Sequence, residues 1–381
     1  MPSMTGIIST NYSPDNCGIL AEDRGIAALP FFGRYRLVDF PLSNMVNSGI
    51  TDLGIIAPTN FRALLDHVGI GKEWALSRKS GGLHILPGSP FGQKNLNGRF
   101  LINDILKNKE VIDKLINEYI AISATSKIFN LDYNEVLEYH LNNNADITLI
   151  YKENLSRLGP KDYSILTESD KVVSISNSSE DRNNCFLDSL IINKSILRYI
   201  VYNCKQDEHL DLLEYLSKNV TDLNIFAYKY VGYVGSFNSV RDYLKTNQQL
   251  LDCNIKSEVF NKHRPIITKT QDNPPAKYTS SSNINDSVIS TGCIIKGTVD
   301  NSIIFRGVII EENTIVKNSI IFQNSTIGKN SYLDNVVMDK QTNIDDYMSI
   351  TGDYRDPIVL DKNNKYRKDR IYNVKPNKKR S

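Results

Sequence analysis

Two arginines and one aspartate stand close together in the segment FFGRYRLVDFPLSN, residues 31–44. Arg34 and Arg36 adjoin an apolar run that contains Asp39, and a helix is expected to start at Ser43. Two cations beside a half-buried acid at the edge of a sheet are suited to handling phosphate groups. The alternative is structural, with Arg36 and Asp39 forming a salt bridge that supports the fold.

The histidines and cysteines do not suggest a metal centre. The five histidines are dispersed, and none forms an H-x-x-x-H pair. The five cysteines lack C-x-x-C spacing, which favours reduced thiols in the cytoplasm over a disulfide framework or a zinc site. We therefore predict a cytoplasmic protein with no metal and no cofactor. The cysteines are Cys17, Cys185, Cys204, Cys253 and Cys293.

Size and composition indicate a protein of two domains. The chain has 381 residues, of which 40% are hydrophobic and 23% charged, and its formal net charge is +2. This balance gives no global field that would demand nucleic acid or a membrane. The longest apolar runs, such as residues 53–57, are far shorter than the roughly 20 residues of a membrane-spanning helix. The first ten residues do not resemble a secretory signal.

The first part of the chain, which contains Arg34, Arg36 and Asp39, alternates between segments typical of strands and of helices. Short apolar runs at 51–57, 118–124 and 146–153 are typical of buried strands. Between the last two, Asp132 and Glu135 provide a capping-box start for a helix. Such alternation predicts a Rossmann-like α/β domain with a mostly parallel sheet.

A final helix over 239–252 completes this domain, which we place at residues 1–253. The following segment loses periodicity and contains three prolines, so residues 254–282 are predicted to be a linker. The prolines are Pro265, Pro274 and Pro275.

Beyond the linker, aliphatic residues recur every six positions, with Gly and Asn supplying turns. This period is the hexapeptide repeat of a parallel β-helix. We predict a left-handed parallel β-helix over 283–352 and a basic C-terminal extension over 353–381. The unbroken ladder is Ile303, Ile309, Ile315, Ile321, Ile327 and Leu333.

Three collinear segments point to a known family. Residues 31–50 resemble the signature F-G-G-K-[FY]-R-[IL]-[IV]-D-F-x-L-S-N-x-x-N-S-G-I of glucose-1-phosphate adenylyltransferase (ADP-glucose pyrophosphorylase). Residues 274–278, PPAKY, resemble the entry to that family's β-helix, and residues 287–310 resemble its first coils. The resemblance implies a nucleotidyltransferase fold and a link to glycogen synthesis from ATP and glucose 1-phosphate. It also implies tetramers under allosteric control.

The positions that carry the family's chemistry differ here. The loop G-G-x-G-[ST]-R-L is replaced by TNYSPDNCGILAEDRG, which keeps only Gly18 and Gly25 and contains Asp15, Glu22 and Asp23. A triphosphate cradle needs free backbone N–H groups and no opposing negative charge.

Both family positions for metal-binding aspartates are lost, since they fall on Ser126 and Tyr233. The motifs E-K-P, T-Q-Y and G-T-A-D-A fall on residues 177–179, 57–59 and 98–102, where NSS, APT and GRFLI stand. Loss of both metal carboxylates should lower the rate on the order of a thousandfold or more. We therefore predict that the chain alone has no catalytic residues, the alternative being a divergent nucleotidyltransferase active on its own.

The resemblance is to the family's regulatory, non-catalytic branch. It implies that the chain assembles with a catalytic subunit into a hetero-oligomer, which by analogy with the family is a tetramer. The alternative is a homo-oligomer. It also implies an anionic or phosphorylated effector, whose matching residues are Arg24 and Arg36, while a family lysine falls on Ile26. Hexapeptide acyltransferases use a histidine on the β-helix, but none follows His263. The basic tail with interleaved tyrosines is compatible with nucleic acid, but the near-neutral remainder of the chain favours a solvated tail.

Overall fold

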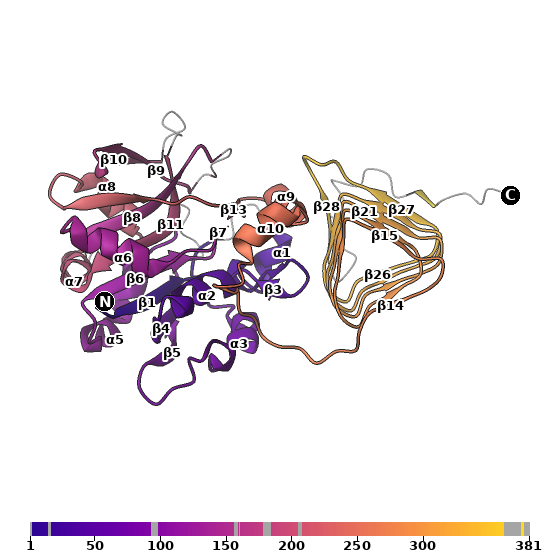
Figure 1. The fold of residues 1–381 in the computed structure, drawn as a ribbon, viewed down its shortest axis with the longest axis horizontal. Helices are drawn as coiled ribbons and strands as arrows, with labels where there is room; N and C mark the ends of the chain where they lie inside the picture. Colours follow the sequence, from indigo (N-terminus) through magenta and orange to yellow (C-terminus); the bar gives the residue numbers. More distant parts are fainter. Residues whose placement is uncertain are drawn as a thin grey trace.

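A computed structural model describes residues 2–13, 17–92, 98–155, 159, 161–177, 184–204, 208–361 and 375–376. Figure 1 shows an α/β domain beside a β-helix, which is seen nearly end-on as a triangle. Both predicted architectures are therefore confirmed. Most of the predicted basic extension, residues 362–374 and 377–381, lies outside the described residues. None of the described helices is long and apolar enough to span a membrane.

The α/β domain is built on a nine-stranded sheet. Strands β10 and β11 run opposite to the other seven, so the sheet is mixed, with parallel pairing among β5, β4, β1 and β6 and between β8 and β12. The strands, in spatial order, are β5 (Gly82–Pro87), β4 (Asp52–Ala57), β1 (Met4–Ser9), β6 (Tyr119–Ala124), β11 (Asn184–Asn193), β8 (Ile147–Glu153), β12 (Ile225–Lys229), β10 (Lys171–Ser176) and β9 (Ser164–Glu168).

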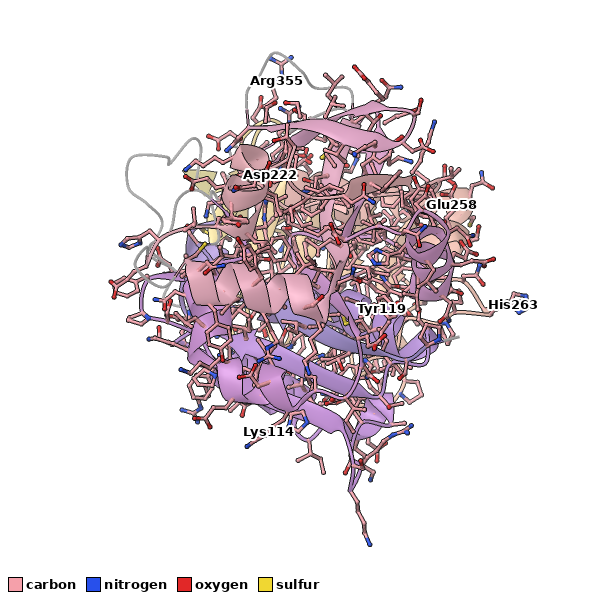
Figure 2. All side chains as sticks on the ribbon, turned by 90° about the vertical axis from the view of Figure 1, so that its left-hand side faces the viewer. Lys114, Tyr119, Asp222, Glu258, His263 and Arg355 are labelled. Carbon is pink, nitrogen blue, oxygen red and sulfur yellow. The ribbon has the colours of Figure 1, made fainter. Side chains whose placement is uncertain are left out.

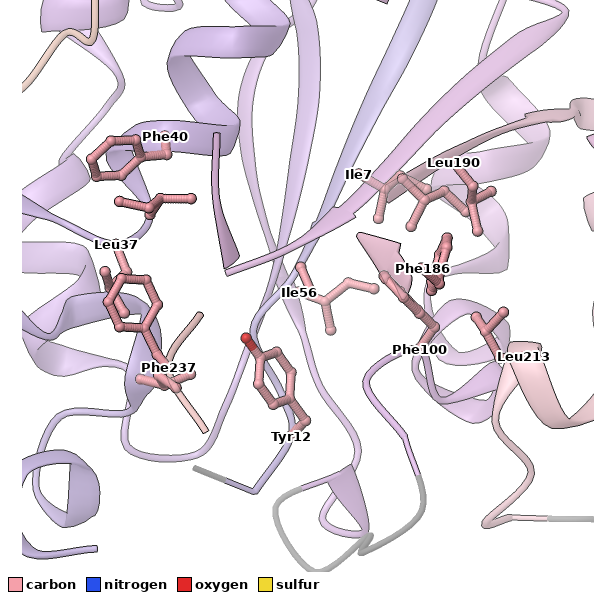
Figure 3. Close-up of a cluster of buried hydrophobic side chains, with 14 of the residues drawn as sticks. Ile7, Tyr12, Leu37, Phe40, Ile56, Phe100, Phe186, Leu190, Leu213 and Phe237 are labelled. Carbon is pink, nitrogen blue, oxygen red and sulfur yellow. The ribbon is translucent and has the colours of Figure 1, made fainter. Parts of the chain in front are cut away.

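Helices cover both faces of this sheet. Successive strand residues point to opposite sides, so a strand made of apolar residues presents an apolar surface on each face that helices can cover. Ile7 of β1 packs in one buried cluster (Figure 3), and its neighbour Ile8 packs in another. Residues of α4, α5, α7 and α8 join the first cluster, and residues of α2, α3 and α6 join the second. The helices are α1 (Ile19–Glu22), α2 (Asp39–Asn47), α3 (Arg62–Val68), α4 (Ile102–Lys107), α5 (Lys109–Lys114), α6 (Tyr133–Asn142), α7 (Lys194–Asn203), α8 (Leu212–Lys218), α9 (Val240–Gln249) and α10 (Cys253–Val259).

Two of three helix starts are as predicted. The side chain of Asp132 caps α6 by accepting from the N–H of Asn134, and Ser239 caps α9. The helix expected from Ser43 begins earlier, at Asp39, so this prediction was wrong. Pro41 is compatible with that start, since the first turn of a helix needs no backbone donor.

The second part is a parallel β-helix with three faces (Figure 1). Each coil adds one short strand to each of three sheets, and repeated contacts join residues 17 positions apart. The first sheet contains β14 (Lys277–Tyr278), β17 (Ile294–Ile295), β20 (Ile309–Ile310), β23 (Thr326–Ile327) and β26 (Asn343–Ile344). The second contains β15 (Asn283–Asn285), β18 (Thr298–Asp300), β21 (Ile315–Lys317), β24 (Tyr332–Asp334), β27 (Met348–Thr351) and β29 (Lys375–Pro376). The third contains β16 (Val288–Ile289), β19 (Ile303–Ile304), β22 (Ile320–Ile321), β25 (Val336–Met338) and β28 (Ile358–Leu360).

The predicted ladder is offset by one residue in its first half. Ile309 and Ile315 lie on the outer face, and their neighbours Ile310 and Val316 fill the core. The next inward residue is Ile321, which follows Val316 by five positions, so the six-residue ladder moves from the outer to the inner face there. The six-residue period was predicted correctly, and the structure adds that the first three residues of the ladder face outward.

The third face of the β-helix packs against the α/β domain. Ile303, Ile320 and Val337 project outward from it, yet they are fully buried and belong to the same cluster as Phe31 and Tyr243. The two parts therefore share one apolar core.

A buried ion pair adds to this contact, since Nη2 of Arg24 lies 2.5 Å from Oδ2 of Asp339. The hydroxyl of Ser290 donates to the carbonyl of Gly33 at 2.8 Å. Within the predicted linker, residues 254–282, the structure has most of helix α10 and the first β-helix strand, β14.

Candidate functional site

The motif at 31–44 does not form the ion pair expected from its sequence. The guanidinium of Arg36 donates to the carbonyl of Ala63 at 2.7 Å, and only the backbone N–H of Arg36 donates to Asp39, at 2.9 Å. The other oxygen of Asp39 lies 2.5 Å from Nε2 of His67. Asp39 is 0% exposed, not half-buried as expected. Burial lowers the pKa of Arg36 to about 10, against the opposing effect of Asp39. Arg34 is exposed.

Arg24 is engaged in the contact with the β-helix. Its side chain is 7% exposed and binds both oxygens of Asp339. An anion that used this guanidinium would have to compete with a buried carboxylate.

A cavity of about 400 Å³ lies beside the motif at 31–44, where residues 32–35, α10 and the first coil of the β-helix meet. The cations that line it are Arg34 and Lys256, and its apolar wall includes Tyr35 and Phe260, whose stacked rings have centroids 4.8 Å apart.

The carboxyl ends of β1 and β6 mark the region where a sheet of this type binds ligands. The strands end side by side, with Ser9 paired to Ala124. Beyond them the buried ring of Tyr12 reaches across, and its hydroxyl lies 2.8 Å from Oγ1 of Thr125 (Figure 3 shows Tyr12). The guanidinium of Arg99 lies 6.0 Å from this ring. Protein side chains therefore occupy the start of this region.

Lys127 lies at the centre of the same region, on the short strand β7 (Lys127–Ile128). Its Nζ donates to Oδ1 of Asp162 at 2.6 Å and to Oδ2 of Asp188 at 2.5 Å. The Lys127 side chain is 1% exposed. Ser126, which was predicted to replace a metal-binding aspartate of the family, donates to the same Oδ2 of Asp188 at 2.5 Å. An ammonium group thus bridges two carboxylates that come from separate elements.

Arg99 completes a buried charge cluster, which we define as Arg99, Lys127, Asp162 and Asp188. Its Nη1 lies 3.3 Å from an oxygen of each aspartate. Asn238 donates to Oδ2 of Asp162 at 2.8 Å. Two positive and two negative groups therefore balance. Lys114 and Asp222, labelled in Figure 2, are by contrast exposed charged residues.

The electrostatics of the cluster favour its charged form. Burial alone would lower the pKa of Lys127, but Asp162 and Asp188 outweigh it and raise that pKa above its ordinary value. Burial would raise the pKa of Asp162, but Lys127 and Arg99 outweigh it and lower that pKa to about 2. The ammonium of Lys127 and the carboxylate of Asp162 therefore remain ionised at neutral pH.

A β-bulge aims Asp188 at the cluster. The register of β11 against β8 shifts between Phe186 and Leu190, and Asp188 has φ 52°. Aspartate tolerates this left-handed conformation better than most residues. Bulges of this kind redirect side chains beside functional sites.

The second family metal position does not meet the first. Pairing of β13 (Gly235–Ser236) with β7 brings the two segments together. The hydroxyl of Tyr233, however, donates to Gln249 at 2.9 Å, whereas the hydroxyl of Ser126 donates to Asp188. Among the described residues, no group of three or more His, Cys, Asp and Glu could hold a metal ion. Ser178 and Ser179 of the sugar-phosphate motif lie outside the described residues.

Sequence reasoning missed the cluster itself. Arg99 stands in the segment GRFLI and Lys127 directly follows Ser126. Both segments were compared with motifs of the family, but only the residues that differ from those motifs were noted there. Asp188 interrupts the apolar run CFLDSLII, and a lone acid in a buried strand was the available signal.

Comparison with known protein families agrees with the two domains and with their order along the chain. Residues 20–162 match the family described as nucleotidyl transferase, and residues 274–362 match that described as GlmU-like, C-terminal hexapeptide.

Similar proteins extend the match to almost the whole chain. The glycogen biosynthesis protein GlgD of Bacillus subtilis is 31% identical over 359 residues, which cover 94% of this chain and 96% of that protein. The GlgD of Geobacillus stearothermophilus is 31% identical over 316 residues, 82% of each chain. The glucose-1-phosphate adenylyltransferase of Pseudothermotoga lettingae is 31% identical over 312 residues, 78% of this chain and 73% of that enzyme. The chain therefore belongs to the family that comprises glycogen biosynthesis protein GlgD and the glucose-1-phosphate adenylyltransferases.

Proposed function

We propose that this chain is a non-catalytic subunit that assembles with a catalytic glucose-1-phosphate adenylyltransferase and raises its activity in glycogen biosynthesis. The observation that carries the proposal is the bridging of Asp162 and Asp188 by Lys127, with Ser126 beside them. The match to GlgD over nearly its full length supports the pathway.

Nucleotidyl transfer requires a divalent cation. The cation binds phosphate oxygens and neutralises their negative charge while one P–O bond forms and another breaks. The two carboxylates in this region are already occupied by the ammonium of Lys127. The ring of Tyr12 lies beyond the strand ends, with its hydroxyl against Thr125, and Arg99 of the charge cluster lies over this ring. The geometry thus supports a chain that does not perform the transfer.

A non-catalytic subunit can act only by binding the active conformation of its partner more tightly than the inactive one. A typical coupling of about 1–3 kcal/mol corresponds to a change in affinity of roughly 5–150-fold. The β-helix and its junction with the α/β domain are intact, with a shared apolar core, so the framework needed for assembly is present.

The test uses the purified full-length chain with ATP, glucose 1-phosphate and Mg²⁺. We expect no ADP-glucose above a reaction without protein. Sustained turnover by this chain would refute the non-catalytic assignment and favour the alternative, an enzyme active on its own.

The partner is tested by mixing this chain with the catalytic adenylyltransferase of the same cell. We expect a mixed oligomer in size-exclusion chromatography, with a higher rate or a lower KM than the catalytic subunit alone. The catalytic subunit with bovine serum albumin at equal mass is the control. Separate elution of the two chains would refute the assembly.

A further inference from the structure

The ammonium of Lys127 has the surroundings of a bound cation. Two carboxylate oxygens lie 2.6 and 2.5 Å away, and the side chains of all three residues are almost fully buried. The carboxylates come from distant parts of the chain, the segment before β9 and the bulge in β11. Both carboxylates contact the ammonium group of Lys127, which is held in place covalently because Lys127 belongs to β7.

Arg99 cannot take over this role. Its guanidinium lies 3.3 Å from each aspartate, and it also donates to the carbonyl of Lys161 and to Asn238. Without Lys127, one guanidinium would face two buried carboxylates, which leaves one negative charge without a partner. Such a charge in a protein interior strongly favours the binding of any cation that fits.

We propose that Lys127 is a tethered cation, which occupies a cation-binding position between Asp162 and Asp188 and keeps free cations out. The wild-type chain binds no free cation there. Removal of the ammonium creates a site for a small primary ammonium ion or for a divalent cation with a preference for oxygen ligands. This inference concerns the cluster alone and does not require the partner proposed above.

The first experiment is chemical rescue of Lys127→Ala. n-Propylammonium supplies the atoms that this substitution removes, three carbons and the ammonium. The variant should lose roughly 10 °C in Tm, as expected for a broken buried ion pair in a protein of this size. Millimolar n-propylammonium chloride should raise the Tm of the variant by several degrees and leave the wild type unchanged.

Matched additives separate charge from packing. Propanol has the same shape without the charge, and sodium chloride has the ionic strength without the ammonium, so neither should restore the Tm. Equal rescue by propanol would show that Lys127 acts by filling space, which would overturn the proposal.

The second experiment measures a divalent cation directly. Electron paramagnetic resonance of Mn²⁺ should show bound metal with Lys127→Ala beyond any bound by the wild type. The double variant Lys127→Ala, Asp188→Asn should lose that additional binding, because only one carboxylate remains. Failure of both n-propylammonium and Mn²⁺ to bind or stabilise folded Lys127→Ala overturns the proposal.

Charge balance provides a test if Lys127→Ala does not fold. The double variant Lys127→Ala, Asp188→Asn removes one charge of each sign and leaves Arg99 with Asp162. It should be recovered as folded protein, with a higher Tm than Lys127→Ala in any condition where both can be measured. If the double variant is as defective as the single one, the tethered-cation proposal is refuted, whereas the mixing experiment above remains a separate test of the partner.

Discussion

Both parts of this molecule have apolar cores, but they differ in what else is buried inside them. In the β-helix, equivalent aliphatic residues such as Ile310 and Ile327 repeat from coil to coil, and each is fully buried. In the α/β domain, the charge cluster occurs once, and each of its two cations contacts both of its aspartates. A repeated apolar interior distributes stability over many similar residues, whereas the cluster concentrates it in a few that cannot substitute for one another.

Substitution in the cluster should therefore have the largest effect. Asp162→Ala removes a carboxylate that binds Lys127, Arg99 and Asn238 and leaves an uncompensated positive charge. We expect the free energy of unfolding to fall by about 3–5 kcal/mol. Denaturation in urea, followed by circular dichroism, measures this change.

The exposed Asp222→Ala is the control and should change stability by less than about 0.5 kcal/mol. A loss of similar size at Asp162 and Asp222 would contradict the contrast between the two parts of the molecule.

The rungs of the β-helix should give intermediate and nearly equal effects. Ile310→Ala and Ile327→Ala each remove a fully buried side chain, and each should cost about 2–4 kcal/mol. Ile309→Ala, on the outer face, should cost less than either. If one rung costs far more than the other, stability is not distributed as the repeat indicates.

The cluster should also make stability depend on pH. The pKa of Asp162 is lowered from 3.8 to about 2, so its contribution is present above pH 3.8 and is lost as pH falls toward 2. The shift corresponds to about 2 kcal/mol. We expect the difference in stability between wild type and Asp162→Asn to shrink over this range, measured by urea denaturation at several pH values.

Asp211 provides a control of opposite sign. Burial raises its pKa from 3.8 to about 6, against the backbone N–H groups of Phe100 and Leu213, so stability falls as pH rises between these values. Asp211→Asn should remove that dependence and leave the acid dependence due to Asp162 in place. A loss of both would mean that the two carboxylates titrate together.

The turns of the β-helix should give the smallest effect. Asn324 has φ 58°, a conformation that asparagine and glycine tolerate better than alanine. Asn324→Ala should cost about 1 kcal/mol, and Asn324→Gly should cost less. Differential scanning calorimetry of the two variants checks the order, and an equal loss would show that the amide group matters more than the backbone.

The same contrast explains what the sequence could predict. The hexapeptide period is local and repeated, so the β-helix was recognisable, although the period alone did not show whether Ile309 or its neighbour Ile310 faces inward. The prediction that Ser126 and Tyr233 replace metal-binding aspartates was possible because each stands in a segment that resembles a family motif.

The cluster was not visible, because its members are far apart in the chain. Lys127 lies 35 residues from Asp162 and 61 from Asp188, and one sequence gives no sign of such pairings. The ion pair of Arg24 with Asp339 spans 315 residues, so it was equally hidden, and the assignment of Arg24 to an effector remains a prediction.

The bridge made by Lys127 also bears on how such a chain could change over generations. An aspartate introduced at position 126 would stand beside Asp188, whose Oδ2 now accepts from Ser126 at 2.5 Å, and would add a third carboxylate to a buried group. Loss of Lys127 by itself would leave Asp162 and Asp188 short of one positive charge. Each single step toward a metal-binding centre at this cluster thus passes through a less stable protein, so reaching such a centre would need several simultaneous substitutions.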